Sequence, residues 1–302
     1  MTRAEAAILA SFAADSLALG AHWEYDTQRI AAQLGRVENL LEPTLNTYHA
    51  GKKAGAQSHY GDQALLLFRT IIEEGGFVLP LFAERWQEMM ATYTGYRDKA
   101  TRETLANFAL GKPPTQSGAA TNDFAGAARM APLLALHGHD AAQLAQAARA
   151  QAMMTHGAEV IGEGAEFLAH AAVALIEGAG MEDALRAALG AKSYKALPAE
   201  DWLEFALMSR HVPSSEAITR FGQSCAMQGA FCGVVHLVVR NEDEPEKALV
   251  ENVMGGGDSC ARGLAAGMLF GARHGGEWLP ERWLNTLAVT PIIRTWFATH
   301  GK

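Results

Sequence analysis

Apolar residues recur with a helical period along nearly the whole chain, and short polar or glycine-containing segments interrupt them. Caps and prolines such as Asp140 and Pro80 mark several of the expected helix starts. We find no convincing strand alternation and no repeat of fixed period. The pattern predicts helices near 3–19, 62–74, 81–93, 99–110, 140–155, 157–177, 181–189, 199–210, 224–240, 258–271, 280–287 and 291–299, with others starting at Asn122 or Asp123 and at Glu244 to Glu246.

The length and composition allow a large hydrophobic core. The chain has 302 residues, of which 49% are hydrophobic, and this is enough for one large domain or two smaller ones. The predicted connections are short and no linker stands out. We therefore expect an all-α fold, a compact multi-helix domain that spans residues 1–302.

The stretch Asn252–Gly271 carries three glycines spaced by four residues. Because residues four apart share one helix face, Gly263, Gly267 and Gly271 form a strip without side chains. Such a strip lets a helix press its backbone against another element. We expect this helix to be buried against a neighbouring one.

Just before this helix, Gly255–Gly257 run into Asp258. An aspartate at a helix N-terminus is favoured by the exposed N–H groups and the helix dipole, and Arg262 lies one turn further on the same side. One interpretation is an ordinary N-cap with a helical ion pair. The other is a carboxylate that points into a functional site.

Charge and cysteine content limit the possible partners. The net charge of −8 and a pI near 5.8 make a nucleic-acid backbone an unfavourable partner. No segment reaches the roughly 18 uncharged apolar residues that a membrane helix needs, and Glu5 and Asp15 interrupt the N-terminal apolar run. Three cysteines without CxxC spacing argue against disulfides or structural zinc, so we expect a cytoplasmic protein.

Polar residues that could perform chemistry gather in four clusters: 22–26, 59–63, 117–129 and 255–262. In two of them a glycine precedes an aspartate that opens a helix. If these helix ends converge, Asp62 and Asp258 form a pair that binds a hard cation or shares a proton. Two independent caps are the alternative. HExxH, GxSxG, Walker and GxGxxG signatures are absent from the sequence.

Taken in order, the four clusters resemble the ADP-ribosylglycohydrolase superfamily, most closely its branch with the J-crystallins of box jellyfish. This resemblance implies an all-α fold with a central cleft that holds two magnesium ions. In the hydrolytic members these ions position ribose for cleavage of a glycosidic bond to ADP-ribose. The matching stretches are AADSLALGAHWEYD, HAGKKAGAQSHYGDQALLL, SGAATNDFAGAARMAPL, MMTH and NVMGGGDSCARGLAAGMLFGARHG.

The metal motifs depart from the family pattern. Thr-Asp-Asp-Thr is replaced by Tyr60-Gly61-Asp62-Gln63, and Cys260 replaces the second aspartate of Gly-Gly-Asp-Thr-Asp-Thr. A hard cation needs about six oxygens, so Asp62, Asp258 and Ser259 with waters favour one Mg²⁺ over two. A protein without any bound ion is a further alternative.

The resemblance implies a hydrolase that acts on an ADP-ribosylated or related small-molecule substrate. Besides Asp62 and Asp258, we expect Glu24 or Asp26 to activate water, although Glu24 lies two residues further from Asp15 than in the family pattern. One alternative is a silent binder or crystallin-like structural protein, and another is a metal-free hydrolase with Asp62 and Asp258 as acid and base. The expected ligand-binding residues are His22, Trp23, Tyr25, His59, Tyr60, Gln63, Asn122, Asp123, Gly256, Gly257, Ser259 and Arg262.

Overall fold

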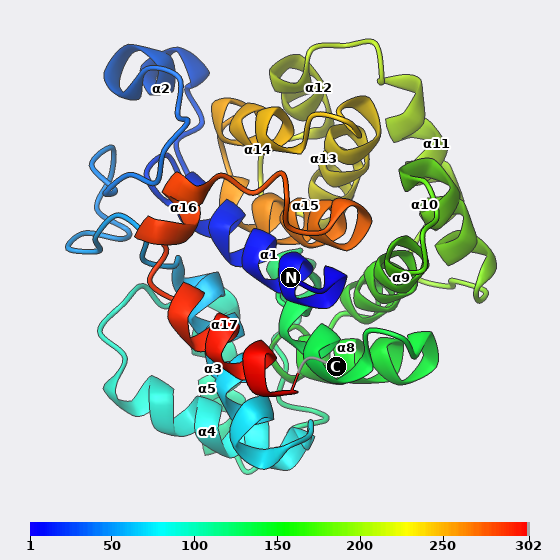
Figure 1. Ribbon diagram of the computed structural model, residues 1–302. Coiled ribbons are helices and arrows are strands. Elements are labelled where there is room, and N and C mark those ends of the chain that lie inside the picture. Colours follow the sequence, from blue (N-terminus) through cyan, green and yellow to red (C-terminus); the bar gives the residue numbers. More distant parts are fainter. Residues whose placement is uncertain (301–302) are drawn as a thin grey trace.

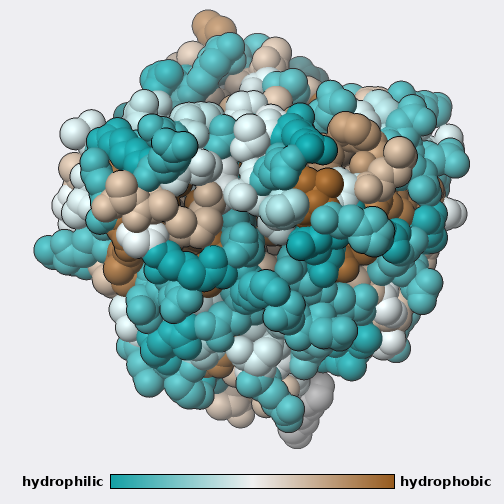
Figure 2. All heavy atoms as spheres, turned by 90° about the horizontal axis from the view of Figure 1, so that it is seen from above, coloured by the Kyte–Doolittle hydropathy of each residue, from teal (hydrophilic) through white to brown (hydrophobic). Residues whose placement is uncertain are grey.

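The computed structural model describes residues 1–300, and these residues form an all-α fold, as the sequence predicted. Within these residues the β-type pairing consists of isolated bridges, Ala119 with His156 and Asp123 with Ala226. None of the described helices is long and apolar enough to cross a membrane. On the face seen from above, polar side chains predominate and apolar residues gather in separate small patches (Figure 2).

Helix α1 (Arg3–Leu19) runs through the middle of the molecule, directly against α15 (Ser259–His274) (Figure 1). The glycine strip of α15 faces the α1 backbone, which confirms the expected close packing. A Cβ atom on Gly267 would lie 2.4 Å from the Ala10 carbonyl oxygen, and one on Gly271 would lie 2.4 Å from that of Ala6. The two helices therefore pack backbone to backbone at the centre of the core.

The other helices surround this pair in order along the chain (Figure 1). Helices α3 to α5 and α17 lie on one side and α8 to α10 on another, while α13 and α14 pack on α15 with α11 and α12 outside them. Their bounds are α2 Thr27–Leu34, α3 His59–Glu74, α4 Leu79–Thr92, α5 Lys99–Ala109, α6 Ala125–Ala128, η1 Ala131–Leu133, α7 Leu134–His137, α8 Ala141–Thr155, α9 Glu159–Ile176, α10 Met181–Gly190, α11 Ala199–Met208, α12 Ser214–Phe221, α13 Met227–Arg240, α14 Pro245–Met254, α16 Glu281–Thr286 and α17 Thr290–His300.

Two helix starts near the expected site differ from the prediction. Thr27–Leu34 forms α2 where a loop was expected, because the Asp26 carboxylate accepts hydrogen bonds from the amides of Gln28 (2.9 Å) and Arg29 (3.1 Å). Helix α3 begins before Asp62, since the Ser58 hydroxyl caps it. Asp62 therefore lies in the first turn and does not open the helix.

Other boundaries also differ from the periodic pattern. Helix α12 was not predicted, and α13 starts at Met227 and not at 224. The stretch after Asp123 divides into α6, η1 and α7, with Pro132 inside η1. A proline removes one backbone donor, so a continuous α-helix through this position is disfavoured.

Candidate functional site

Asp258 is fully buried at the N-terminus of α15, where it acts as the predicted cap. Its Oδ1 accepts a long hydrogen bond from the Ala261 amide (3.4 Å), and the Tyr60 hydroxyl donates to Oδ2 (3.2 Å). His22 Nδ1 lies 3.6 Å from Oδ1. Burial raises the pKa of Asp258, whereas the Arg262 cation acts in the opposite direction.

The glycine loop before Asp258 is fixed to the first polar cluster. Trp23 donates from its amide to the Gly257 carbonyl (2.9 Å), and the Gly257 amide donates to the Glu24 carbonyl (2.6 Å). Gly256 and Gly257 have φ of 68° and 67°, and a Cβ on Gly257 would lie 2.1 Å from the Gln223 carbonyl oxygen. This loop therefore requires glycine, as the sequence indicated.

Arg262 is fully buried and bonds to protein atoms around the loop. Its guanidinium donates to Asn252 Oδ1 (3.0 Å) and to the carbonyls of Gly256 and Gln223. Burial lowers the pKa of Arg262 to about 10, while Asp258 raises it. The side chain thus holds the loop in place and supplies a positive charge near Asp258.

Replacement of Arg262 by methionine is expected to lower the free energy of unfolding by about 3 to 5 kcal/mol. The change leaves buried carbonyls without a donor and Asp258 without its nearby cation. Urea unfolding of wild type and variant would measure the loss. A change below about 0.5 kcal/mol, the usual limit for surface substitutions, would contradict this role.

A second carboxyl group, that of Asp123, lies next to Asp258. One atom each of Asp123, Cys225 and Asp258 lie within 4.8 Å of one another. Hydrogen bonds join the two loops beside them, from the Phe124 amide to the Cys225 carbonyl and from the Met227 amide to the Asn122 carbonyl (both 2.8 Å). Burial, followed by the charge of Asp258, raises the pKa of Asp123 to about 8.

The rim beside this carboxyl pair is exposed. Tyr25 is 49% exposed, and Asn122 is also exposed although its backbone is held by Met227. Burial raises the pKa of Tyr25, and the charge of Asp258 contributes in the same direction, which places this phenol near the pair. Asp123 itself is 8% exposed, so the pair lies just below the surface.

The structure places Asp62 in different surroundings. Its Oδ2 accepts hydrogen bonds from Lys52 Nζ (2.6 Å) and from the Tyr93 hydroxyl (2.5 Å). Among the described contacts, no hydrogen bond or ion pair links Asp62 to Asp258. No contact therefore supports the expected pairing of Asp62 with Asp258. The carboxyl group that lies beside Asp258 is that of Asp123.

Other expected residues are engaged in structural contacts. Glu24 pairs with Arg29 (2.7 Å) and accepts from the Asp26 amide (3.0 Å), while exposed Asp26 caps α2. Gln63 accepts hydrogen bonds from Trp86 and Arg129, so its amide is occupied inside the core. The buried Ser259 hydroxyl has no hydrogen-bond partner among the described residues.

Aromatic side chains cover the other side of Asp258. Trp23 stacks on His22 with ring centroids 4.4 Å apart, and Tyr48 and Tyr96 meet Trp23 edge-on at 4.8 and 5.0 Å. Trp23 is the non-glycine residue with positive φ (61°) in the described chain, held there by its bond to the glycine loop. His22, Trp23, His59 and Tyr60 are thus brought together as expected.

Asp15 of α1 is a fully buried carboxyl group beneath this site. It accepts hydrogen bonds from the Ser58 amide (2.7 Å) and hydroxyl (2.5 Å). Burial raises the pKa of Asp15 from 3.8 to about 7. The folded protein therefore keeps this proton over a pH range in which the unfolded chain releases it.

Because the folded-state pKa is raised, the contribution of Asp15 to stability is greatest below about pH 4 and is lost as the pH rises toward 7. Relative to Asp15→Asn, wild type is expected to lose up to about 4 kcal/mol over this range. Chemical unfolding of both proteins at several pH values would measure it. A stability difference that stays constant with pH would show that Asp15 is not protonated in the folded state.

Sequence comparison identifies the family to which this fold and site belong. A profile of the ADP-ribosylglycohydrolase family matches residues 1–299. The chain belongs to this family. Crystallin J1A of Tripedalia cystophora is 26% identical over 304 residues, covering 94% of this chain and 91% of that protein, and Crystallin J1B of the same species is 24% identical over 303 residues with the same coverage.

A solved structure has the same fold. The ADP-ribosylglycohydrolase-related protein complex superposes with a TM-score of 0.77 over 97% of this chain and 95% of the matched chain, at 21% sequence identity. At this identity the likeness concerns the fold alone. The family resemblance deduced from the ordered motifs is confirmed.

The donor set of this ADP-ribosylglycohydrolase family member does not fit two magnesium ions. Such a pair shares several carboxylates, each ion with about six oxygens. Here Lys52 and Tyr93 occupy Asp62, and buried Cys260 lies where the family has its second aspartate, with its sulfur 3.4 Å from the Asp15 carbonyl oxygen. We therefore assign no chemical step to magnesium.

Several residues of this region carry no sequence signal that predicted their place in the site. His49, Tyr48, Tyr96 and Cys225 all contact or adjoin the expected site. His49 lies in the same loop as Lys52, between α2 and α3. The Asn122-Asp123 dipeptide had been assigned to ligand binding, but its proximity to Asp258 depends on a contact with the chain near Cys225 that no local pattern shows.

Proposed function

We propose that this chain is a hydrolase that cleaves an N- or O-glycosidic bond to ADP-ribose or a related nucleotide, with Asp123 and Asp258 as the reacting carboxyl pair. The observation that supports this proposal is the close approach of these two groups at the N-terminus of α15. Pairs of carboxyl groups carry out glycoside hydrolysis in many enzymes. Family membership supplies the substrate class.

The two carboxyl groups have different surroundings, which assigns their roles. Asp123 is close to the surface and its raised pKa keeps it protonated near neutral pH, as a general acid requires. Asp258 has the helix N-terminus, Tyr60 and Arg262 to stabilise its negative charge. Asp123 would protonate the leaving nitrogen or oxygen as the glycosidic bond breaks.

Asp258 would then stabilise the positive charge that develops on the ribose, and water would add to the anomeric carbon. The proton that this water loses returns to the Asp123 carboxylate, so the cycle closes without a cofactor. Exposed Tyr25 and Asn122 would contact the substrate at the rim. Glu24 and Asp26, held by Arg29 and by the α2 cap, are left out of this mechanism.

The direct test is release of free ADP-ribose from model substrates. Wild-type protein would be incubated with ADP-ribosyl-arginine, ADP-ribosyl-serine peptide and O-acetyl-ADP-ribose, with EDTA or with added Mg²⁺, and products separated by liquid chromatography. We expect product from at least one substrate in the presence of EDTA. If product forms only with Mg²⁺, the metal-free mechanism is wrong. If no product forms under any condition, the proposal that the chain is a hydrolase is wrong.

A catalytically silent ADP-ribose binder is the second candidate. It is supported by the Lys52–Asp62 ion pair, which neutralises the carboxylate of the first metal motif, and by similarity to two proteins named crystallins. Calorimetric binding of ADP-ribose without turnover of any substrate would favour it. The three free cysteines are compatible with the reducing cytoplasm that we propose as its location.

A further inference from the structure

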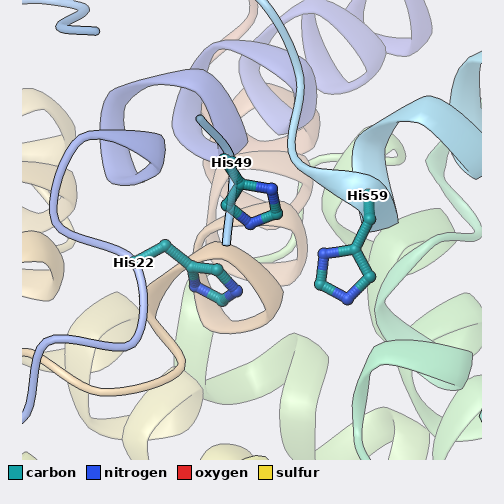
Figure 3. A group of neighbouring side chains, drawn as sticks. All are labelled: His22, His49 and His59. Carbon is teal, nitrogen blue, oxygen red and sulfur yellow. The ribbon is translucent and has the colours of Figure 1, made fainter. Parts of the chain in front are cut away.

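Three histidines from separate segments meet in the interior of the protein (Figure 3). His22 follows α1, His49 lies in the loop between α2 and α3, and His59 is the first residue of α3. One ring nitrogen of each lies within 4.8 Å of one nitrogen of the other two. We propose that these histidines bind a single zinc-type divalent cation.

The unpaired nitrogens are the first argument. All three side chains are buried, and none of their six ring nitrogens has a hydrogen-bond partner among the described residues. A buried polar atom without a partner costs about 1 to 3 kcal/mol, so even the four of these nitrogens that face no carboxylate require an explanation. By contrast, buried His236 contacts Ser209 and Ser214 through its two nitrogens.

Neighbouring carboxylates are the second argument. Asp98 Oδ2 lies 3.4 Å from His59 Nε2, and Asp258 Oδ1 lies 3.6 Å from His22 Nδ1. Histidines that bind metals generally present their second nitrogen to such a carboxylate, which orients the ring and increases its basicity. This arrangement leaves His59 Nδ1 and His22 Nε2 for the cation.

The chemistry of the donors selects the class of ion. His22, His49 and His59 each offer an imidazole nitrogen, and neutral imidazole is the commonest metal ligand that a side chain supplies. Imidazole nitrogens suit zinc and related transition ions and do not suit magnesium, which prefers oxygen. Three histidines at about 2.0 to 2.1 Å leave a fourth, tetrahedral position for water.

A pocket adjoins the histidine cluster. His49 lines a pocket of about 560 Å³ together with Tyr48, Lys52, Tyr93 and Tyr96. The Lys52 ammonium in this pocket is paired with Asp62 at 2.6 Å, which reduces its repulsion of a cation. The three imidazoles themselves are buried, and Trp23 packs against His22 and His59.

The test uses chelator-treated full-length protein with Zn²⁺ in calorimetry and Co²⁺ in visible spectroscopy. Wild type is expected to bind one ion per chain and to give the intense visible bands of four-coordinate cobalt. His49→Asn should weaken binding about 100-fold or more, and Asp98→Asn, which retains a capping side chain, about 10- to 100-fold. His236→Asn is the matched control and should bind like wild type.

This metal-binding test does not require the protein to have hydrolytic activity. Thermal unfolding of each variant without metal would verify its fold, and Asp98→Asn serves if His49→Asn does not fold. Absence of binding by wild type, a weak spectrum typical of six-coordinate cobalt, or equal affinity in the folded His49 or Asp98 variant would overturn the proposal.

Discussion

Replacement of Gly267 by alanine is expected to lower the free energy of unfolding by about 3 kcal/mol or more, although alanine favours helices. The added Cβ would lie 2.4 Å from the carbonyl oxygen of Ala10 and 3.0 Å from the Ala14 side chain. The obstacle at the shorter distance is backbone of α1, which is buried along nearly its whole length. Relief would require the two central helices to separate, with loss of contacts throughout the core.

Gly190→Ala provides the matched control. Gly190 is the last residue of α10, and nothing lies within 4 Å of the position that its Cβ would take. Alanine there should be neutral or stabilise the protein by less than about 1 kcal/mol. Urea unfolding curves of the two variants would measure the difference in stability. Equal midpoints would show that the α1–α15 contact has room for a side chain at Gly267.

The second large effect is expected at Asp258. Asp258→Asn should reduce hydrolysis about 1000-fold or more, because it removes the negative charge that the proposed mechanism needs opposite the reacting ribose. Asparagine keeps the oxygen that caps α15, so the fold should be retained. Single-turnover rates would measure the loss, with the model substrate from which wild-type protein releases ADP-ribose.

Asp62→Asn separates this mechanism from the one suggested by the metal motifs. Since Asp62 bonds to Lys52 and Tyr93, its replacement should change the rate less than about 10-fold if its role is structural. If Asp62→Asn is as inactive as Asp258→Asn, the two aspartates act together and the assignment of Asp123 is wrong. Circular dichroism of both variants would verify their folds.

The sequence predicted the features of this protein that depend on local patterns. Helical periodicity located most helices, and the spacing of Gly263, Gly267 and Gly271 predicted the close backbone packing of α15 on α1. The Asp258 cap followed from its position after three glycines. The ordered polar clusters were sufficient to identify the family.

Features that depend on contacts between distant segments were not predictable in this way. Asp62 and Asp258 follow the same local pattern of glycine, aspartate and helix, but Lys52 and Tyr93 determine the surroundings of Asp62. Likewise, Asp123 approaches Asp258 because its loop is hydrogen-bonded to the chain around Cys225. His49 lies in an irregular loop and had no periodic signal that pointed to the other histidines.

The pairing of α1 with α15 has a consequence for biosynthesis. About 240 residues separate the end of α1 from the start of α15, and ribosomes add about 5 to 20 residues per second. The apolar segment of α1 therefore remains without its partner α15 for at least about ten seconds during synthesis. During synthesis this segment is an expected binding site for nascent-chain chaperones, and the final core forms only after α15 has been synthesised.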